Sequence, residues 1–203
     1  MSIYGFVADT KNREPQKAFK LMKYMFWIDL EMTGLDVEKN RIIEVAVIVT
    51  NVHLEYVEKY QAVVRQPQAF LDQMDDWNVG THGESGLTRE VPRGKHPREV
   101  EGDLENLMVK YFPNKRVMLA GNSVGHDKLF LDAYMPKVAK LLHYRIIDIS
   151  SMKAIFQSRY DVRFKRGENH RAMADIEESI NELKLYLSFL DPSKINAFLD
   201  SED

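Results

Sequence analysis

The chain has 203 residues, of which 44% are apolar, and a formal net charge of −3. This size and composition suit one compact domain with a substantial core, and the absence of cysteine excludes disulfides, thiolate metal sites and cysteine nucleophiles. No apolar stretch approaches the length of a membrane span, and the mildly acidic balance argues against a protein that grips a long nucleic-acid backbone through many cations.

Residues 1–23 mix several basic side chains with Asp9 and Glu14. An organellar transit peptide is richer in Arg and Ser and poorer in acidic residues. We therefore expect residues 1–23 to form an N-terminal extension, or a helix packed against the body. A cytoplasmic protein is expected, with a mitochondrial pool as the alternative.

The apolar, aromatic-rich run at residues 24–30 predicts a buried strand. Because side chains alternate between the two faces of a strand, Asp29 and Glu31 should project to one side together with Trp27. Two neighbouring carboxylates repel each other unless a cation lies between them. The pair is therefore a candidate cation site, and the alternative is two solvated acids at a fraying strand end.

Two further strands are expected at residues 41–50 and 56–64. The short connection at 51–54 predicts that they pair as an antiparallel hairpin. Helices are expected at 69–78 and 97–112. The second of these has apolar residues at helical spacing and Pro97 at a position that suits a first turn.

A second acidic motif follows the apolar run at 116–120, which predicts a strand. Asn122 or Ser123 is expected to cap a helix that begins near Gly125. Asp127 then lies in the first turn of this helix, at the carboxyl end of the strand. The alternative is an Asp placed there only because a negative charge favours a helix N-terminus.

The C-terminal third contains a strong helix at 170–189, whose apolar residues recur at helical spacing. His170 and Asp175 are five residues apart and do not share a face of an ideal helix, but His170 at the frayed start can swing over a site. The alternative is a loop histidine before a solvated acidic face. Shorter helices are expected at 127–135, 136–142 and 150–157, with a strand at 144–148 and a polar loop at 158–169.

Three antiparallel strands followed by strands alternating with helices indicate an α/β domain. The three motifs together offer four carboxylates and one imidazole: Asp29, Glu31, Asp127, Asp175 and His170. Four carboxylates suit a pair of hard cations, and the imidazole suits a general base, as in two-metal hydrolysis of a phosphodiester.

In these three motifs the sequence resembles the oligoribonuclease family, of the DEDDh class of 3′→5′ exonucleases. The similarity rests on Trp27-Ile-Asp-Leu-Glu-Met-Thr-Gly-Leu, on Gly121-Asn-Ser with Asp127, and on His170-x-Ala-x-x-Asp175. Further matches are Met74-Asp-Asp-Trp-Asn with His82, and His143-Tyr-Arg. The resemblance implies a ribonuclease H-like exonuclease fold, a mixed five-stranded sheet flanked by helices, over residues 24–190, with 191–203 as a C-terminal tail.

The resemblance also implies an activity, which is the 3′→5′ hydrolysis of very short RNAs, down to dinucleotides, to nucleoside 5′-monophosphates. Asp29, Glu31, Asp127 and Asp175 are expected to hold two divalent cations, Mg²⁺ or Mn²⁺. His170 is expected to act as the general base, in its neutral form.

The expected partner is short single-stranded RNA, bound by a homodimer. Leu35 and Trp77 are expected to wedge and stack against the bases, and His82 to contact the scissile region. Ser123, Arg145 and Ser150 are expected to bind the 5′-phosphate, and Tyr144 to reach the site of the partner subunit. The alternatives are structural roles: a core aromatic for Trp77, a helix cap for His82 and a strand aromatic in the dimer core for Tyr144.

Two rival functions remain open. A DNA-directed or general RNA-trimming DEDDh exonuclease could share the same five catalytic residues. A non-catalytic RNA-binding module is less consistent with the sequence, because a binder has no need of crowded carboxylates.

Overall fold

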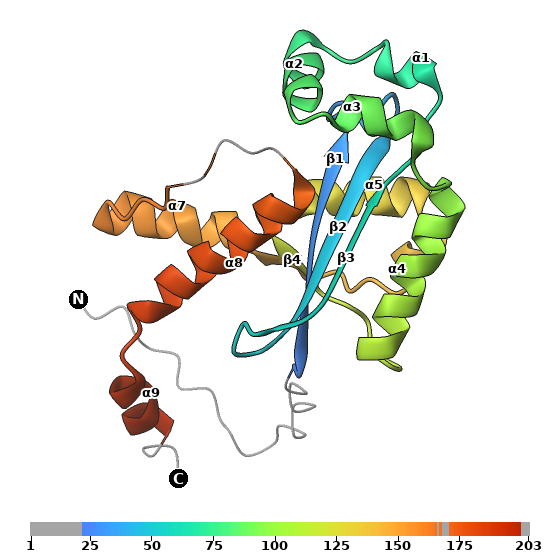
Figure 1. The fold of residues 1–203 in the computed structure, drawn as a ribbon. Coiled ribbons are helices and arrows are strands. Elements are labelled where there is room, and N and C mark those ends of the chain that lie inside the picture. The colour runs from blue at the N-terminus through green and yellow to red at the C-terminus, as the bar shows by residue number, and fades with distance from the viewer. Residues whose placement is uncertain (1–21, 166, 168–170, 200–203) are drawn as a thin grey trace, which may run out of the picture.

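Five strands form one mixed sheet, in the order β3-β2-β1-β4-β5, in the computed structural model, which describes residues 22–165, 167 and 171–199 (Figure 1). β1 pairs antiparallel with β2, and β2 with β3, whereas β1-β4 and β4-β5 are parallel pairs. The strands are β1 Tyr24–Met32, β2 Ile42–Asn51, β3 Tyr56–Val63, β4 Leu119–Gly121 and β5 Ile147–Asp148.

Helices cover both faces of this sheet and one end of it (Figure 1). The short helices α1 to α3 and one 3-10 turn lie beyond the carboxyl end of β1, while α4, α5 and α6 lie on one face and α7 and α8 on the other. Their bounds are α1 Gln68–Leu71, α2 Asp76–Glu84, α3 Leu87–Glu90, α4 Pro97–Tyr111, α5 Gly125–Tyr134, α6 Pro136–Ala139, α7 Ile149–Tyr160, α8 Ala172–Ser188 and α9 Pro192–Leu199, with the 3-10 turn at Val91–Arg93.

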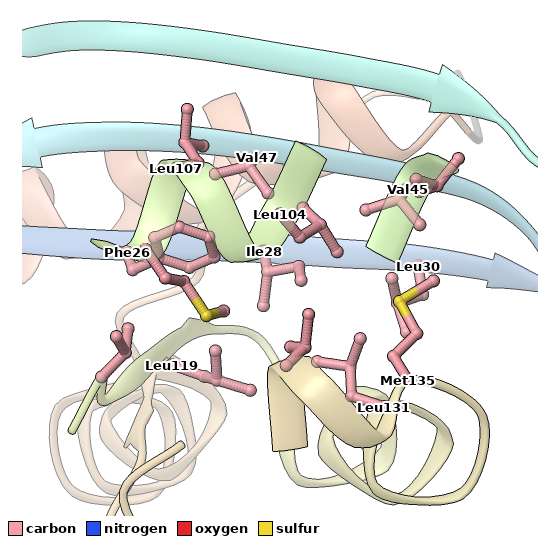
Figure 2. Packing of buried hydrophobic residues seen from close by; sticks show 14 of the residues in the cluster. Phe26, Ile28, Leu30, Val45, Val47, Leu104, Leu107, Leu119, Leu131 and Met135 are labelled. Carbon is pink, nitrogen blue, oxygen red and sulfur yellow. The ribbon is translucent and has the colours of Figure 1, made fainter. Parts of the chain in front are cut away.

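Alternation along β1 divides the core into two layers. Phe26, Ile28 and Leu30 face α4 and α5, where they pack against residues such as Leu104 and Leu131 (Figure 2). The other face of β1 presents Met25 and Trp27 to α7 and α8. The predicted assignment of faces is therefore confirmed, and Asp29 and Glu31 continue the face that α8 covers.

The predicted α/β arrangement, a mixed five-stranded sheet flanked by helices, is confirmed. The long elements agree with the sequence pattern to within a few residues, including the hairpin between β2 and β3. Within the described part of the chain, no helix combines the length and the apolar character needed to cross a membrane.

Some predicted boundaries are wrong. The single helix expected at 69–78 is two helices, α1 and α2, because Asp75 ends the connection by accepting a hydrogen bond from the backbone N–H of Asn78 and so caps α2. Neither Asn122 nor Ser123 caps α5, whose N-cap residue is Val124, without a side-chain cap. The strand expected at 116–120 is the shorter β4 at 119–121, and the strand expected at 144–148 is reduced to the two residues of β5. The expected C-terminal tail at 191–203 includes α9, and the bounds of the exonuclease domain stay a prediction.

Candidate active site

The carboxyl-terminal part of β1 holds the first two acidic residues. Asp29 lies opposite Ala46 of β2, and Glu31 lies opposite Glu44, before an irregularity in the pairing between Glu31 and Met32. Directly opposed residues on antiparallel strands project to the same face. The strand therefore places Asp29, Glu31 and Glu44 on the face covered by the start of α8.

Asp175 brings the third carboxylate to this place from the first turn of α8. One carboxylate oxygen from each of Asp29, Glu31 and Asp175 lies within 4.8 Å of the others, and all three residues are half-buried. Residues 29 and 175 are far apart in the sequence, so the packing of α8 against β1 and β2 is what creates the cluster.

Asp127 lies next to this cluster, in the first turn of α5 as predicted. Its side chain is 6% exposed, and its Oδ1 accepts a hydrogen bond of 2.9 Å from the backbone N–H of Leu30. This bond fixes α5 to β1 between Asp29 and Glu31. Among the described residues, the group within 4.8 Å consists of the other three acids and does not include Asp127.

The electrostatics of the cluster favour protonation in the absence of a cation. Burial, followed by the negative charges of Asp175, Glu44 and Asp127, raises the pKa of Glu31 to about 8, against a smaller opposing effect of Arg171. Burial also holds the pKa of Asp127 above its ordinary range, and the charge of Asp148 acts in the same direction. A cation bound between the carboxylates would offset the repulsion that adds to the effect of burial on Glu31.

The donor set fits divalent cations of the Mg²⁺ and Mn²⁺ type. Such hard ions take oxygen ligands, and the described cluster offers carboxylate oxygens from three residues, with a fourth carboxylate beside them. Burial raises the pKa of Glu31 and the neighbouring acids raise it further, as expected for acids arranged around a cation rather than for one another.

His170, the predicted general base, lies outside the described residues. The structure does describe the next residue, Arg171, which is the N-cap residue of α8. The place of His170 in the chain therefore adjoins the helix that carries Asp175, and its role stays a prediction.

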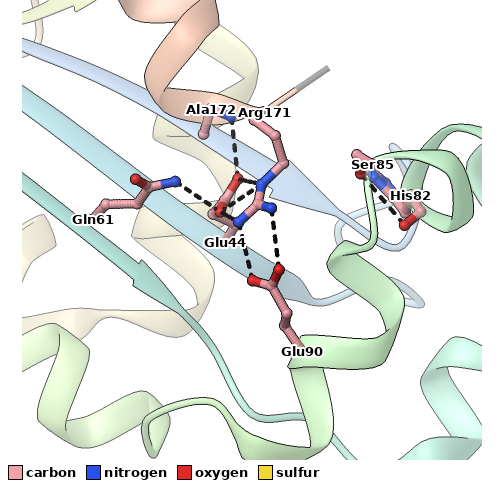
Figure 3. A network of polar contacts seen from close by, with 7 residues as sticks. All are labelled: Glu44, Gln61, His82, Ser85, Glu90, Arg171 and Ala172. Carbon is pink, nitrogen blue, oxygen red and sulfur yellow. Dashed lines mark hydrogen bonds and ion pairs between the residues drawn. The ribbon is translucent and has the colours of Figure 1, made fainter. Parts of the chain in front are cut away.

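The sequence analysis missed an ion-pair network beside the carboxylates (Figure 3). Glu44 is fully buried, and its carboxylate accepts hydrogen bonds from Arg171, from Gln61 and from the backbone N–H of Ala172. Arg171 also pairs with Glu90 of α3. A single acid inside the apolar run of β2 was the available signal, since a buried charge requires a partner.

Three residues expected to contact bases or the partner subunit are exposed. The exposed fractions are 69% for Leu35, 65% for Trp77 and 75% for Tyr144. The alternative of a core aromatic is therefore wrong for Trp77. Tyr144 precedes β5 and stacks on His143, with ring centroids 4.5 Å apart. Their exposure is consistent with the predicted contacts, which stay predictions.

The residues expected to bind a 5′-phosphate converge only in part. The hydroxyl oxygens of Ser123 and Ser150 lie 3.5 Å apart, although 27 residues separate them in the sequence. Asp148 lies between them, because its Oδ1 accepts from the backbone N–H groups of both serines and from the Ser150 hydroxyl. The guanidinium of Arg145 lies over the ring of Tyr144, 5.3 Å from its centroid.

His82 is 1% exposed, on α2. Its Nε2 lies 3.0 Å from the carbonyl oxygen of Met32, at the end of β1. This contact joins α2 to the strand that carries Asp29 and Glu31. His82 thus lies at the end of the strand that carries Asp29 and Glu31. Its contact with a substrate stays a prediction.

Comparisons with known proteins agree with this geometry. Residues 26–183 match the exonuclease family. The chain is 42% identical over 178 residues to the mitochondrial oligoribonuclease of Homo sapiens, covering 85% of this chain and 75% of that protein. It is 42% identical over 171 residues to the oligoribonuclease of Bordetella pertussis, covering 82% of this chain and 94% of that protein.

Solved structures extend the similarity of the fold. Escherichia coli exonuclease I, in a zinc-bound complex with single-stranded DNA, matches with a TM-score of 0.66 at 14% identity, covering 81% of this chain and 40% of that chain. Exonuclease I from Methylocaldum szegediense matches with a TM-score of 0.61, covering 78% of this chain and 39% of that chain. This chain thus spans less than half of either structure, and the likeness concerns the fold.

The fold and the carboxylate cluster define a nuclease, a hydrolase with a ribonuclease H-like exonuclease fold. The sequence comparisons are more specific, and the chain belongs to the oligoribonuclease family. The predicted family and fold class are both confirmed.

Proposed function

We propose that the protein is a 3′→5′ exoribonuclease that hydrolyses very short RNAs, down to dinucleotides, to nucleoside 5′-monophosphates. The observation that carries this proposal is the convergence of Asp29, Glu31 and Asp175 within 4.8 Å in a chain whose relatives are oligoribonucleases. Because the proposed substrates are very short, this function does not require a deep groove for a long RNA.

Asp29, Glu31, Asp127 and Asp175 hold two divalent cations, Mg²⁺ or Mn²⁺, in this proposal. When bound, the cations supply a water of lowered pKa and neutralise charge on the leaving 3′-oxygen. The chain's own part is to fix the carboxylates: β1 sets the spacing of Asp29 and Glu31, and α8 brings Asp175 to them. The bond from the Leu30 N–H orients Asp127.

His170 accepts a proton from the attacking water, as general base. The role requires a neutral imidazole, so the rate falls as the imidazole becomes protonated. The resemblance of His170-x-Ala-x-x-Asp175 to the third motif of the family supports this assignment.

Selection for short RNA comes from contacts at both ends of the substrate. The exposed Leu35 and Trp77 pack against bases, and stacking of this kind tolerates any sequence. His82 is assigned to the region of the scissile bond, a role supported by its contact with the end of β1 and opposed by its burial. Ser123, Arg145 and Ser150 receive the 5′-phosphate, a role supported by the approach of the two serine hydroxyls and opposed by the charge of Asp148.

We also propose a homodimer, in which the exposed Tyr144 reaches the site of the partner subunit. Light scattering tests the assembly, and mixing Tyr144→Ala subunits with Asp29→Asn subunits tests the exchange of residues. Mixed dimers should then have a different specific activity from the sum of the separate variants. A cytoplasmic location is proposed, with a mitochondrial pool as the alternative, and imaging of the tagged chain in its host decides between them.

The decisive experiment for the proposed function is product analysis with end-labelled RNAs and DNAs from two to about twenty nucleotides long, with and without Mg²⁺. The proposal expects metal-dependent release of nucleoside 5′-monophosphates, fastest on the shortest RNAs. Faster hydrolysis of DNA, or rates that rise with length, would replace it with the DNA-directed or general RNA-trimming alternative. Binding without hydrolysis would make the chain an RNA-binding module.

A further inference from the structure

The network around Glu44 lies between the carboxylate cluster and the helix that supplies Asp175 (Figure 3). Glu44 is 0% exposed, and its carboxylate receives Nε and Nη2 of Arg171, at 3.0 and 2.6 Å from Oε1. Gln61 donates to the same oxygen at 3.0 Å. A buried carboxylate with several donors is fixed in place, because loss of any partner leaves charge without compensation.

Glu44 also caps α8 from another element. The first backbone N–H groups of a helix have no partner within it, and Arg171, the N-cap residue of α8, provides no side-chain cap. Instead the N–H of Ala172 donates to Oε2 of Glu44, at 3.1 Å. The start of α8 is thus attached to β2 twice, through a backbone group and through the side chain of Arg171.

The attachment bears directly on Asp175. The backbone N–H of Asp175 donates to the carbonyl oxygen of Arg171, at 3.1 Å, so these two residues occupy the same helical turn. Movement of Arg171 therefore moves a carboxylate of the cluster. A displacement of about 1 Å is enough to impair a site whose ligands must meet at fixed distances.

Arg171 has a second effect through Glu44. Glu44 lies directly opposite Glu31 across the β1–β2 pair, on the same face. An unpaired carboxylate there would repel Glu31 or compete for a cation. Because Arg171 donates to both oxygens of Glu44, it offsets part of the negative charge beside Glu31 and occupies the lone pairs that a cation would need.

We propose that Arg171 is a positioning residue of the metal site: paired with the buried Glu44, it holds the first turn of α8 so that Asp175 meets Asp29 and Glu31, and it keeps Glu44 out of the cation's ligand set. This inference rests on the proposed role of these acids as metal ligands. Nη2 of Arg171 also donates to Oε2 of Glu90 on α3, at 3.1 Å. The Glu44–Arg171 pair is thereby connected to the end of the sheet where α2 and α3 lie.

The test is a Mn²⁺ titration by calorimetry of the full-length chain carrying Arg171→Lys. Lysine keeps the charge but cannot reproduce the two-nitrogen contact with Glu44. The affinity for Mn²⁺ should fall by roughly 10- to 100-fold, the range seen when a residue that orients metal ligands is changed. The Mn²⁺-induced rise in melting temperature should shrink in parallel, while KM for a short RNA at saturating Mn²⁺ should stay close to that of the wild type.

Glu177→Gln is the matched control. Glu177 also ties α8 to the sheet, through an exposed ion pair of 2.5 Å with Lys59 of β3, but it does not contact Glu44. Its Mn²⁺ affinity should equal that of the wild type. An Arg171→Lys protein that melts earlier but binds Mn²⁺ like the wild type would overturn the inference and leave Arg171 as a structural tie.

Should Arg171→Lys fail to fold by circular dichroism, the double variant Glu44→Gln, Arg171→Met decides, because it replaces the buried ion pair with neutral side chains of similar size. The amide introduced by Glu44→Gln can still accept from the Ala172 N–H, so Mn²⁺ affinity should lie between those of the wild type and Asp175→Asn; wild-type affinity would again overturn the inference. The titration contains no RNA. A wild type that binds Mn²⁺ without cleaving RNA therefore refutes the proposed function alone.

Discussion

The carboxylate cluster and the surface expected to bind the nucleotides are built in different ways. The cluster takes its side chains from β1 and α8, long elements that are each anchored in the core by several buried residues. The nucleotide surface takes them from short helices and connections, and Leu35, Trp77 and Tyr144 are mostly exposed. In the proposed function, the chemistry thus depends on groups fixed before substrate arrives, whereas recognition depends on exposed groups that RNA or a second subunit would cover.

The largest expected effect comes from removing one carboxylate. Asp29→Asn, Glu31→Gln, Asp127→Asn and Asp175→Asn should each lower kcat by about 10³-fold or more, because metal ions supply several kcal/mol and each 1.36 kcal/mol is a factor of ten. Steady-state kinetics at fixed Mn²⁺ measures this. Melting of the metal-free variants should not fall much, because each change relieves repulsion.

Asp161→Asn is the control for these variants, since Asp161 is exposed and pairs with Arg163 at the end of α7. It should keep wild-type turnover. A cluster variant that keeps wild-type turnover at limiting Mn²⁺ would show that its residue is not a metal ligand. That residue would then not belong to the fixed catalytic site.

The general base comes next in size. His170→Ala should lower kcat by roughly 10²–10⁴-fold, the usual contribution of general acid–base catalysis, while Mn²⁺ affinity survives. Rapid-quench kinetics and calorimetry measure the two quantities. If Mn²⁺ affinity collapses in this variant, His170 is a metal ligand and belongs to the fixed cluster itself.

Recognition of the 5′-phosphate sharpens the other side of the comparison. A 5′-phosphorylated dinucleotide should be cut faster than the same dinucleotide without the phosphate, and Arg145→Ala should remove most of the difference. Hydrogen bonds to charged groups contribute about 1.5–3 kcal/mol, so the loss is roughly ten- to over a hundred-fold in kcat/KM. Ten-mers should lose less, because their 5′-phosphate lies beyond this contact.

Arg159→Ala is the matched control for Arg145→Ala, because each guanidinium lies over the ring of an adjacent tyrosine, at 5.6 Å for Arg159 and 5.3 Å for Arg145. Equal losses on dinucleotides and ten-mers would make Arg145 a structural or general backbone contact. A wild type indifferent to the phosphate would agree with the obstacle that Asp148 presents between Ser123 and Ser150.

Features of the molecule that follow from local backbone geometry could be predicted from the sequence. Period-two alternation placed Asp29 and Glu31 on the face of Trp27, and helical spacing placed Asp175 near the start of a long helix, because both patterns follow from local geometry. The break between α1 and α2 was missed because the cap formed by Asp75 outweighs the apolar spacing around it.

Contacts between distant segments were beyond local patterns. The Glu44–Arg171 pair joins residues 127 positions apart, and its only trace in the sequence is one acid within an apolar strand. The place of Asp148 between two serines is likewise a product of how β4 and β5 pair, and those strands are too short to be located well from periodicity. Such features require the tertiary structure.

The smallest expected effect concerns stability. It tests whether the charged carboxylate cluster lowers the free energy of unfolding of the metal-free protein. Glu31 has an ordinary pKa near 4.5 when unfolded and a pKa of about 8 in the folded chain. Between these pH values the folded state binds a proton that the unfolded state lacks, so stability falls as pH rises through this window. Below pH 4.5 both states are protonated, and the penalty vanishes.

Metal-free protein should therefore melt several degrees lower at pH 8.5 than at pH 5.5, since about 1 kcal/mol shifts the melting temperature by roughly 2–4 °C in a chain of this size. Differential scanning calorimetry in chelator measures the trend. Glu31→Gln should flatten most of it, and saturating Mn²⁺ should reverse it, because binding to the folded state alone stabilises that state. If wild type and Glu31→Gln show the same pH dependence, the charge of Glu31 is already compensated without a cation. The cluster would then be a structural network like that of Glu44 rather than a site held open for metal.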